Sequence, residues 1–491
     1  MKPFSIMHIS DLHRSPFDTI SNDELISALV NDRNRYVVET PSITVPTAIV
    51  VSGDIIQGVS LHEDDFAAKI EKQYAVAEQF LDELVERFLE NDRSRLIMVP
   101  GNHDVDWNTA FSALEPVQDE AVPDNLKAEL HSEDSSLRWD WKTRTLYRIN
   151  DPELYESRLD AFWSFYERFY KNVSGLPVAK NSLDVRLFSL CDSRIGVAAY
   201  NSCYGNDCFA SHGMIRRGTV ARSDLDLNDS RKTYDLRMAV WHHSIEGLPY
   251  HTDYMNIDVV RSMIGRGFRL GLHGHQHKAQ VSPQEICLPD RERMAVIGAG
   301  SLCAGANDLP VGVHRQYNIL EIAEDFRGVR IHVRAMAIAN LFSRWWFTEF
   351  GGASHRDLDW ESPCNSLGLA TSTQIMRKNR LIVEAEKAIN TGDPAHAFCM
   401  LESLELPPES YERQICLLAA TETQNWDAVV NITDPPATIE ELTQRFQAFI
   451  ELGDFNGAVD VLDRFSRLMQ LPVSLESELR SLANAQESMR K

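Results

Sequence analysis

Several apolar segments of this sequence end abruptly in residues that bind metal ions or carry protons. The clearest is 96–104, where an apolar run that we expect to be a buried strand stops at Asn102, His103 and Asp104. An amide oxygen can bind a hard cation, an imidazole can carry a proton near neutral pH, and a carboxylate can orient that imidazole. Taken alone, Gly-Asn-His-Asp fits an ordinary polar turn equally well. The same pattern, an apolar segment that ends in potential metal ligands, recurs elsewhere in the chain, and this recurrence constrains the fold.

Two earlier segments show the same pattern. A short strand is predicted over 4–10, and it is followed by Asp11 and His13. Residues i and i+2 project to the same side of an extended chain, so these two side chains can share one metal. A second apolar strand from residue 48 ends in a glycine, which favours a tight turn, and then Asp54.

Helical patterns separate these strands. Residues 22–38 and 63–91 carry apolar side chains at helical spacing, as expected for helices that cover a sheet. Strand, helix, strand in sequence predicts parallel neighbours joined by crossovers, and ligand sites in such sheets form beyond the carboxyl ends of the strands. We therefore expect the polar strand ends to lie at one edge of the sheet.

Two later segments complete the set. The first ends in His242 and His243, and the second in His275 and His277, which again share one side. We expect His242 to be the ligand and His243 to support it or face the substrate. The seven candidate ligands are Asp11, His13, Asp54, Asn102, His242, His275 and His277. Nitrogen and oxygen donors suit manganese first, with iron, zinc or cobalt as alternatives, better than calcium. So many donors favour two ions bridged by a carboxylate over one tetrahedral ion.

In this order, Asp-x-His, Gly-Asp, Gly-Asn-His-Asp, His-His and Gly-His-x-His resemble the motifs of the calcineurin-like metallophosphoesterase superfamily over residues 5–277. The resemblance implies an α/β fold, a double β-sandwich flanked by helices. It also implies a first metal on Asp11, His13 and His277, a second on Asn102, His242 and His275, and Asp54 as the bridge. By the same resemblance, His103 contacts the phosphate and helps to protonate the leaving group, with Asp104 orienting it.

Substrate preference rests on finer features of the motifs. The segment 53–58 lacks the Gly-Asp-x-Val-Asp-Arg-Gly block of the Ser/Thr protein phosphatases, and Asp104 replaces their glutamate. The segments 9–13 and 99–104 look more like the cyclic-nucleotide phosphodiesterase and DNA-repair nuclease branches, which cleave diesters. Arg14, His243 and Lys278 are candidate substrate contacts, whereas His8 and His273 lie inside apolar strands and are expected to be core residues.

Three functions stay open. The first is a dinuclear phosphodiesterase acting on a nucleotide or nucleic acid, and the second is a phosphomonoesterase or pyrophosphohydrolase with the same site. The third is a partner-binding scaffold with a vestigial metal site, which the intact set of ligands disfavours.

The remaining chain indicates domain organisation. We expect residues 1–350 to form the catalytic domain, with a helical insertion over 105–185 and a linker over 351–372. The aromatic-rich segment 152–172 is predicted to be a helix packed over the sheet; an aromatic wall for a nucleobase or lipid is the alternative. Further strands between 185 and 322 indicate a second sheet.

The region 373–491 is helical in pattern, with recurring turn segments at 392–397, 424–428 and 453–458. Their spacing favours a short array of helical hairpins, similar to tetratricopeptide (TPR) repeats, over a plain helical bundle. Such an array would bind a protein partner or a second copy of the chain; a cover that only stabilises the catalytic domain is the alternative.

Length and composition limit the number of folding units, the possible partners and the cellular compartment. With 491 residues we expect more than one folding unit, and the net charge of −23 argues against broad attachment to nucleic-acid backbones or anionic membranes. The eight cysteines form no CxxC pair, and no apolar run reaches the roughly 18 residues that would suggest a membrane span. A cytoplasmic protein with free thiols is the expectation.

Overall fold

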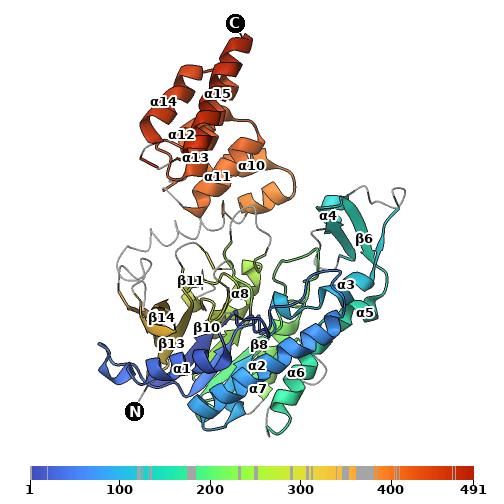
Figure 1. The fold of residues 1–491 in the computed structure, drawn as a ribbon, viewed down its shortest axis with the longest axis vertical. Helices are drawn as coiled ribbons and strands as arrows, with labels where there is room; N and C mark the ends of the chain where they lie inside the picture. The colour runs from blue at the N-terminus through green and yellow to red at the C-terminus, as the bar shows by residue number, and fades with distance from the viewer. Residues whose placement is uncertain are drawn as a thin grey trace. The chain divides into compact units, whose positions relative to one another are not determined.

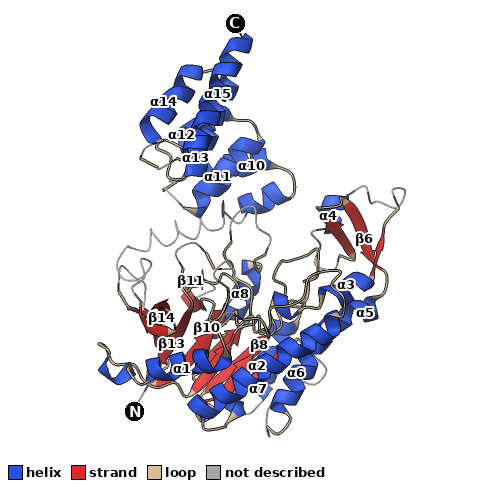
Figure 2. Ribbon diagram, viewed as in Figure 1, coloured by secondary structure: helices blue, strands red, loops and turns tan. Residues whose placement is uncertain are grey.

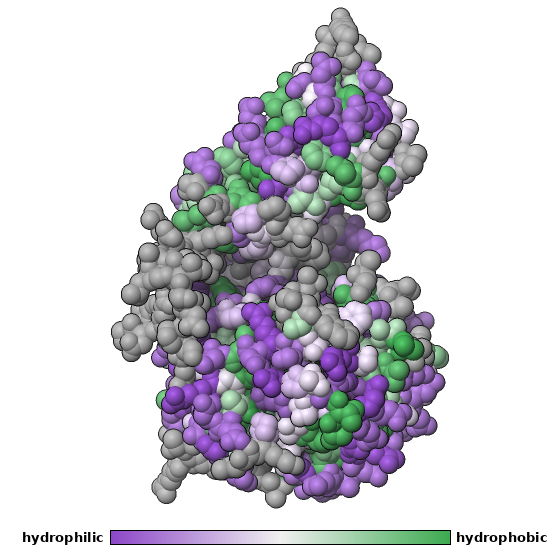
Figure 3. Space-filling model, turned by 90° about the vertical axis from the view of Figure 1, so that its left-hand side faces the viewer, coloured by the Kyte–Doolittle hydropathy of each residue, from purple (hydrophilic) through white to green (hydrophobic). Residues whose placement is uncertain are grey.

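The structure is a computed structural model of the chain. It describes all residues except 1–2, 19, 119–122, 124, 131, 133–134, 174–183, 230–233, 248–252, 288–290, 306–308, 311–312, 339, 346–352, 361–380, 383, 403, 405, 408–409, 467, 470 and 491. Its contacts divide the chain into two compact units, one within residues 1–363 and the other formed mainly by residues 364–491. The face shown in Figure 3 carries many hydrophilic residues between smaller hydrophobic patches, in keeping with the net charge of −23.

The first unit contains a seven-stranded mixed sheet in the order β15-β14-β13-β1-β2-β3, with β16 also paired to β14. Its parallel strands are β1 (Phe4–Ile9), β2 (Ala48–Val51) and β3 (Leu96–Met98). The antiparallel strands are β13 (Gln316–Ile322), β14 (Gly328–Ile338), β15 (Leu341–Arg344) and β16 (His355–Asp359). Helices α1 (Asn22–Arg33) and α2 (Phe66–Leu89) connect the parallel strands, as the amphipathic patterns predicted.

A second sheet of six strands has the order β11-β12-β10-β9-β8-β7. Its strands are β7 (Val185–Leu190), β8 (Ile195–Tyr200), β9 (Leu236–Val240), β10 (Phe268–His273), β11 (Gln280–Cys287) and β12 (Arg291–Gly298). The four inner strands are parallel, and β7 and β11 pair antiparallel at the edges.

One hydrophobic core joins the two sheets. It contains Met7 and Val50 from the first sheet and Val197 and Met238 from the second, all fully buried. Alternate residues of the second sheet, such as Trp241 after β9, belong to a separate core with α7 (Thr219–Asp229) and α8 (Ile257–Ile264). Figure 2 shows the resulting sheets and flanking helices. The predicted α/β fold with sheets flanked by helices is confirmed.

The insertion over 105–185 is only partly helical, so that prediction is wrong in part. It contains the helices α3 (Trp107–Ser112), α4 (Leu126–Leu130) and α5 (Pro152–Glu156) together with a small antiparallel sheet of β4 (Leu114–Pro116), β5 (Leu137–Asp140) and β6 (Thr145–Ile149) (Figure 1). Asp140 forms the β5–β6 turn by accepting hydrogen bonds from the Lys142 N–H at 2.8 Å and the Thr143 hydroxyl at 2.6 Å. This local turn chemistry favours a hairpin over a helix.

The aromatic helix packs over the sheet, as predicted. It is divided into α5, a short 3₁₀ turn and α6 (Asp160–Tyr170). Phe162, Phe165 and Phe169 are fully buried in the main core, and the Phe165 ring stacks on Tyr74 of α2 with centroids 5.0 Å apart. These aromatic rings are therefore core residues.

Strands β11 and β16 lacked an apolar signal in the sequence. β11 is an edge strand that contains Pro283, which a central strand would not tolerate. The polar strand β16 lies inside the range 351–372, so the predicted linker is wrong for residues 355–359. The end of that range, residues 361–372, lies outside the described residues.

A buried ion pair links α1 to β14 and gives a stability prediction. Arg334 donates to both carboxylate oxygens of Asp32, at 2.8 and 2.6 Å, and both side chains are at most 1% exposed. Asp32→Ala is expected to lower the free energy of unfolding by about 3 kcal/mol, the lower end for a broken buried pair, because Glu39 stays 3.0 Å from Arg334. Urea denaturation measures this loss. The exposed pair of Asp357 with Arg330 is the control, and Asp357→Ala should cost at most about 1 kcal/mol; equal losses would contradict the prediction.

The second unit is helical throughout its described part between residues 384 and 486. Its helices are α10 (Pro394–Leu401), α11 (Tyr411–Glu422), α12 (Trp426–Ile432), α13 (Ile439–Leu452), α14 (Phe455–Phe465) and α15 (Val473–Arg490). Each of these helices packs against the next one along the chain.

The three turn segments identified in the sequence share one geometry. In each, a residue with positive φ ends a helix, and the following residue caps the next helix with its side chain. These pairs are Gly392 with Asp393, Gln424 with Asn425, and Gly453 with Asp454. The two N–H groups of each pair also donate to carbonyls three and five residues earlier, as in a Schellman motif. The turn therefore recurs three times in chain order.

Candidate metal centre

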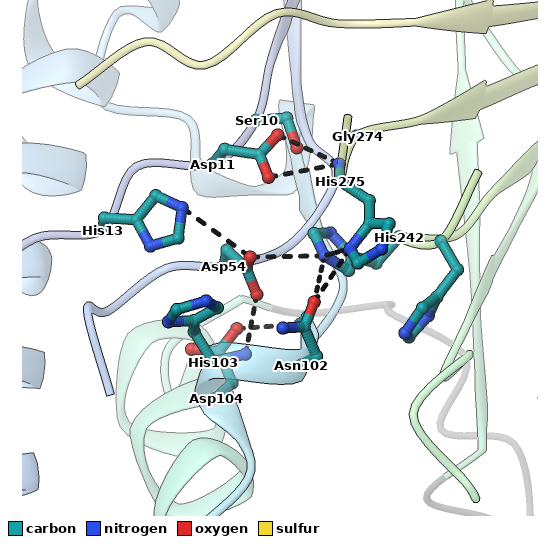
Figure 4. A network of polar contacts seen from close by, with 12 residues as sticks. Ser10, Asp11, His13, Asp54, Asn102, His103, Asp104, His242, Gly274 and His275 are labelled. Carbon is teal, nitrogen blue, oxygen red and sulfur yellow. Dashed lines mark hydrogen bonds and ion pairs between the residues drawn. The ribbon is translucent and has the colours of Figure 1, made fainter. Parts of the chain in front are cut away.

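The candidate ligands all follow the carboxyl ends of parallel strands. Asp11 and His13 follow β1, and Asp54 follows β2. Asn102 begins a 3₁₀ turn after β3, and the three remaining histidines follow β9 and β10. Figure 4 shows Asp11, His13, Asp54, Asn102, His242 and His275 around one point. The structure therefore brings the predicted side chains together from residues up to 266 positions apart in the chain.

The backbone is unusual at these strand ends. Five of the candidates have positive φ, a backbone conformation that residues other than glycine rarely adopt. They are Asp11 (51°), His13 (44°), Asp54 (52°), His275 (75°) and His277 (54°). Such conformations tend to gather at functional sites. Here they turn the chain sharply so that neighbouring strands direct their side chains to one place.

One group of donors consists of Asp11, His13, Asp54 and His277. One ligand atom from each lies within 4.8 Å of the others. The Nε2 atoms of His13 and His277 are 3.2 Å apart, and His277 Nε2 is 3.4 Å from Asp11 Oδ1. The two carboxylates are at most 1% exposed. This group has the donor types and spacing to hold a metal ion.

A second group lies on the other side of Asp54. His242 Nε2 is 2.9 Å from Asn102 Oδ1 and 3.3 Å from both Asp54 Oδ2 and His275 Nδ1. His275 Nδ1 is also 3.0 Å from Asn102 Oδ1. Two imidazole nitrogens, one amide oxygen and one carboxylate oxygen therefore meet at this second point.

Asp54 is shared by the two groups. Its Oδ1 accepts a hydrogen bond from the His103 N–H at 2.8 Å. Its Oδ2 lies 3.8 Å from His13 Nε2 in the first group and 3.3 Å from His242 Nε2 in the second. One carboxylate oxygen therefore faces both groups.

The hydrogen bonding of His242 tests whether a cation fits here. Its Nδ1 lies 2.8 Å from the Ser52 carbonyl oxygen, which can only accept, so Nδ1 carries the proton. In the neutral ring Nε2 then presents a lone pair toward Asn102 Oδ1 and the Asp54 carboxylate. Electron pairs that converge in this way repel unless a proton or a cation lies between them. The donor set therefore fits a metal ion.

Burial and charge set the protonation of these side chains. Burial lowers the pKa of His13 to about 3, which keeps its ring neutral. Burial acts in the same direction on His242, but the Asp54 carboxylate outweighs it and raises the pKa to about 9. Without a metal, a proton therefore occupies the space between His242 and Asp54. A metal must displace that proton, so its affinity should fall as the pH falls below about 9.

Asp104 does not orient the ring of His103, contrary to the expectation from the resemblance. His103 Nδ1 lies 2.7 Å from the Gln57 carbonyl oxygen and donates to it. The Asp104 carboxylate instead accepts from the N–H groups of Gly101 and Ile55, at 2.8 and 3.1 Å, and from a tyrosine hydroxyl. Burial, reinforced by Asp54, raises the pKa of Asp104 to about 7. Asp104 therefore ties together the loops after β2 and β3.

His103 itself lies at the edge of the first group. Its ring packs edge-on against His13, with centroids 4.5 Å apart, and it is partly exposed. Because Nδ1 donates to Gln57, Nε2 is the nitrogen available to exchange a proton.

Two of the three candidate substrate contacts lie away from solvent. Arg14 is 1% exposed and donates to the Ile20 carbonyl oxygen at 3.2 Å and to Asn22 Oδ1 at 2.7 Å, so its role is structural. His243 is fully buried, and its Nδ1 is 2.9 Å from Ser202 Oγ. Lys278 is half-buried next to His277 and stays a prediction. The core histidines are as predicted: His8 is fully buried and His273 is 2% exposed.

Sequence reasoning overlooked several supporting residues. Ser202 Oγ accepts from the N–H groups of His242 and His243 at 3.1 and 3.3 Å, and the Ser52 and Gln57 carbonyls hold two imidazoles. Ser202 follows the end of β8, so the rule that polar residues follow strand ends would have found it. The contacts made by backbone carbonyls could not be predicted, because every residue has a carbonyl whatever its side chain.

Two glycines are required for this packing. Gly53 has φ +102°, and a Cβ there would lie 2.4 Å from His242 Nδ1. A Cβ on Gly274 would lie 1.8 Å from Ser10 Oγ and 2.8 Å from Asp11 Oδ2. The tight turn expected before Asp54 is confirmed.

A buried cluster of aspartate and histidine that could hold a metal ion lies beyond the ends of parallel strands, as in metal-dependent hydrolases. Comparison with protein families gives the same class: residues 4–279 match the family described as calcineurin-like phosphoesterase. Because this match spans more than half of the 491 residues, the chain belongs to the calcineurin-like phosphoesterase family. It is a metallophosphoesterase with a buried Asp/His metal site.

Several solved structures match this chain with low sequence identity and low TM-scores. GAP50, the anchor in the inner membrane complex of Plasmodium, is 12% identical, with a TM-score of 0.33, and the match covers 77% of this chain and 94% of that one. The 5′-nucleotidase from Candida albicans is 12% identical, with a TM-score of 0.32 and coverages of 65% and 48%. The calcineurin-like phosphoesterase YfkN from Bacillus subtilis is 11% identical, with a TM-score of 0.25 and coverages of 79% and 99%.

These similarities carry no information on substrate. A comparison with curated proteins gave no match. Across the described part of the chain, none of the helices combines the length and the apolar character needed to cross a membrane.

Proposed function

We propose that this chain is a dinuclear metal-dependent phosphodiesterase that hydrolyses a phosphodiester of a nucleotide or nucleic acid. The observation that carries the proposal is the shared Asp54 Oδ2, which faces two groups of donors at once. Asp11, His13, Asp54 and His277 would hold one cation, and Asp54, Asn102, His242 and His275 would hold the other. The mixture of nitrogen and oxygen donors suits manganese, iron, zinc or cobalt.

The chemistry needs no side-chain nucleophile. Two bound cations would lower the pKa of water and offset negative charge on the phosphoryl oxygens. With its ring in the imidazolium form, His103 would give the Nε2 proton to the leaving oxygen and keep the Nδ1 proton in its bond to Gln57. Lys278, beside the ligand His277, is a candidate contact for a phosphate oxygen. Asp104 keeps the loop that carries His103 in place through its bonds to Gly101 and Ile55.

The proposed preference for diesters rests on the residues that occupy the motifs. Ile9-Ser-Asp-Leu-His13 and Asp104 resemble the diester-cleaving branches, and the motif of the Ser/Thr protein phosphatases is missing from 53–58. The competing function is a phosphomonoesterase or pyrophosphohydrolase that uses the same side chains.

Comparing two chromogenic substrates separates these functions. With Mn²⁺ added, we expect bis-p-nitrophenyl phosphate to be hydrolysed with a higher kcat/KM than p-nitrophenyl phosphate. The reverse order would favour a phosphomonoesterase, and turnover of neither compound would favour the scaffold alternative. A dinucleotide with a 3′–5′ linkage then tests the nucleotide part of the proposal.

We also propose that the helical region 373–491 binds a protein partner or a second copy of the chain. The three recurrent turns support this proposal, since arrays of stacked helical hairpins present an extended surface. Separate cores within the region indicate that its helices bury their own apolar faces.

Shortening the chain tests this role. A chain ending at Ser372 should stay soluble and hydrolyse a small diester at the full-length rate, but lose self-association or partner binding. Light scattering and the diester assay on both lengths measure the two properties. An unchanged oligomeric mass with unchanged partners would contradict the interaction role. Precipitation of the shortened chain would show that the region belongs to the catalytic core.

A further inference from the structure

Asp253 contacts a candidate ligand from outside the motifs. Its Oδ2 lies 3.2 Å from Nε2 of His275, 22 residues further along the chain. The other nitrogen of that ring, Nδ1, is 3.0 Å from Asn102 Oδ1 and 3.3 Å from His242 Nε2. One imidazole therefore spans from the second donor group to the Asp253 carboxylate.

We infer that Asp253 is a positioning residue that holds His275 as a metal ligand. A carboxylate can only accept a hydrogen bond, so the ring proton of neutral His275 lies on Nε2 and donates to Asp253. Nδ1 then presents its lone pair to the donor group. An anionic partner on the far nitrogen also makes the imidazole a stronger donor toward a cation.

The contact acts on the ring, because the main chain of His275 is held separately. Its N–H donates to both carboxylate oxygens of Asp11 at 3.1 Å. The backbone of His275 is thus anchored with φ 75° whether or not Asp253 is present. The side chain of Asp253 is also 28% exposed, so its removal leaves no large cavity.

The two histidines of the second group have different partners. His242 Nδ1 donates to a neutral backbone carbonyl, that of Ser52, at 2.8 Å, whereas His275 donates to a charged carboxylate. A ligand with an anionic partner binds metal more tightly than one with a neutral partner. Asp253 is therefore expected to set the affinity of the second site selectively.

This inference rests on the proposed dinuclear site, and titration of metal-free protein with Mn²⁺ tests both separately. Calorimetry gives the stoichiometry and affinities, and electron paramagnetic resonance distinguishes a coupled Mn²⁺ pair from an isolated ion. The wild type should bind two ions per chain. Asp253→Ala should weaken the second ion about 10- to 100-fold and leave the first unchanged. Asp253→Asn, which keeps an acceptor oxygen but loses the charge, should fall between them.

Asp258→Ala is the matched control. Asp258 lies on α8, five residues further along the chain, and its exposed side chain pairs with Arg261. This variant should bind Mn²⁺ as the wild type does. Equal affinities for both ions in wild type and Asp253→Ala would overturn the inference, and so would equal weakening of both ions. Fewer than two ions on the wild type would instead overturn the proposed function. Should Asp253→Ala fail to fold, the nearly isosteric Asp253→Asn decides the matter.

Discussion

Asp54→Ala is expected to remove both metal ions and to reduce hydrolysis to the rate of metal-free protein. Its Oδ2 faces His13 at 3.8 Å in one donor group and His242 at 3.3 Å in the other, so a single change affects both. The change also leaves the His103 N–H without the acceptor that it has at 2.8 Å. Metal content per chain, measured by mass spectrometry, and the diester assay test this expectation together.

The control for Asp54→Ala is another carboxylate outside the donor groups. Asp357→Ala removes an exposed side chain of β16 and should keep both metal content and activity. Two ions retained on Asp54→Ala would show that Asp54 does not bridge. Loss of one ion alone would place Asp54 in a single group.

His103→Ala is expected to slow turnover about 100-fold or more while leaving metal content near that of the wild type. The ring packs against His13 but lies outside both donor groups, and its Nδ1 is held by Gln57 at 2.7 Å. A missing general acid matters most when the leaving group is strongly basic. The loss in kcat should therefore be larger for an alkyl phosphodiester than for bis-p-nitrophenyl phosphate, whose leaving group departs without a proton.

His62→Ala is the matched control for His103. His62 is an exposed histidine four residues after Gly58, which borders His103. Its removal should change neither leaving-group dependence nor metal content. An equal loss for both leaving groups, or metal loss in His103→Ala, would show that His103 is not the general acid.

The arrangement of candidate ligands was accessible from sequence because each follows the end of an apolar strand. The alternation of strands and helices predicts a parallel sheet. The carboxyl ends of its strands lie at one edge, so the polar residues that follow them are expected to lie close together. Asp11 and His13, which have i and i+2 spacing, lie in one donor group. His275 and His277 have the same spacing but lie in different groups, so the spacing alone does not assign a ligand to a group.

Local turns explain where the expectations went wrong. His103 and Asp104 are neighbours in a 3₁₀ turn, so their side chains diverge, and the carboxylate meets backbone N–H groups before it can reach the imidazole. Arg14 follows His13, which has a φ of 44°, and its side chain is buried instead of facing the substrate side. Adjacency in sequence is a poor guide to contact where the backbone leaves the strand.

Residues that make long-range contacts but lie outside periodic apolar segments could not be predicted from the sequence. Asp253 lies in a segment of no regular pattern, and nothing in the sequence distinguishes it from the other acidic residues nearby. Strand β16 is polar and pairs at an edge, so it lacks the apolar alternation that reveals a strand.

Removal and return of metal test the central claim most directly. Protein treated with a chelator and then freed of it should not hydrolyse bis-p-nitrophenyl phosphate. Activity should return as Mn²⁺ is added and should reach its maximum at two ions per chain. Undiminished hydrolysis by protein shown to contain no metal would contradict the account.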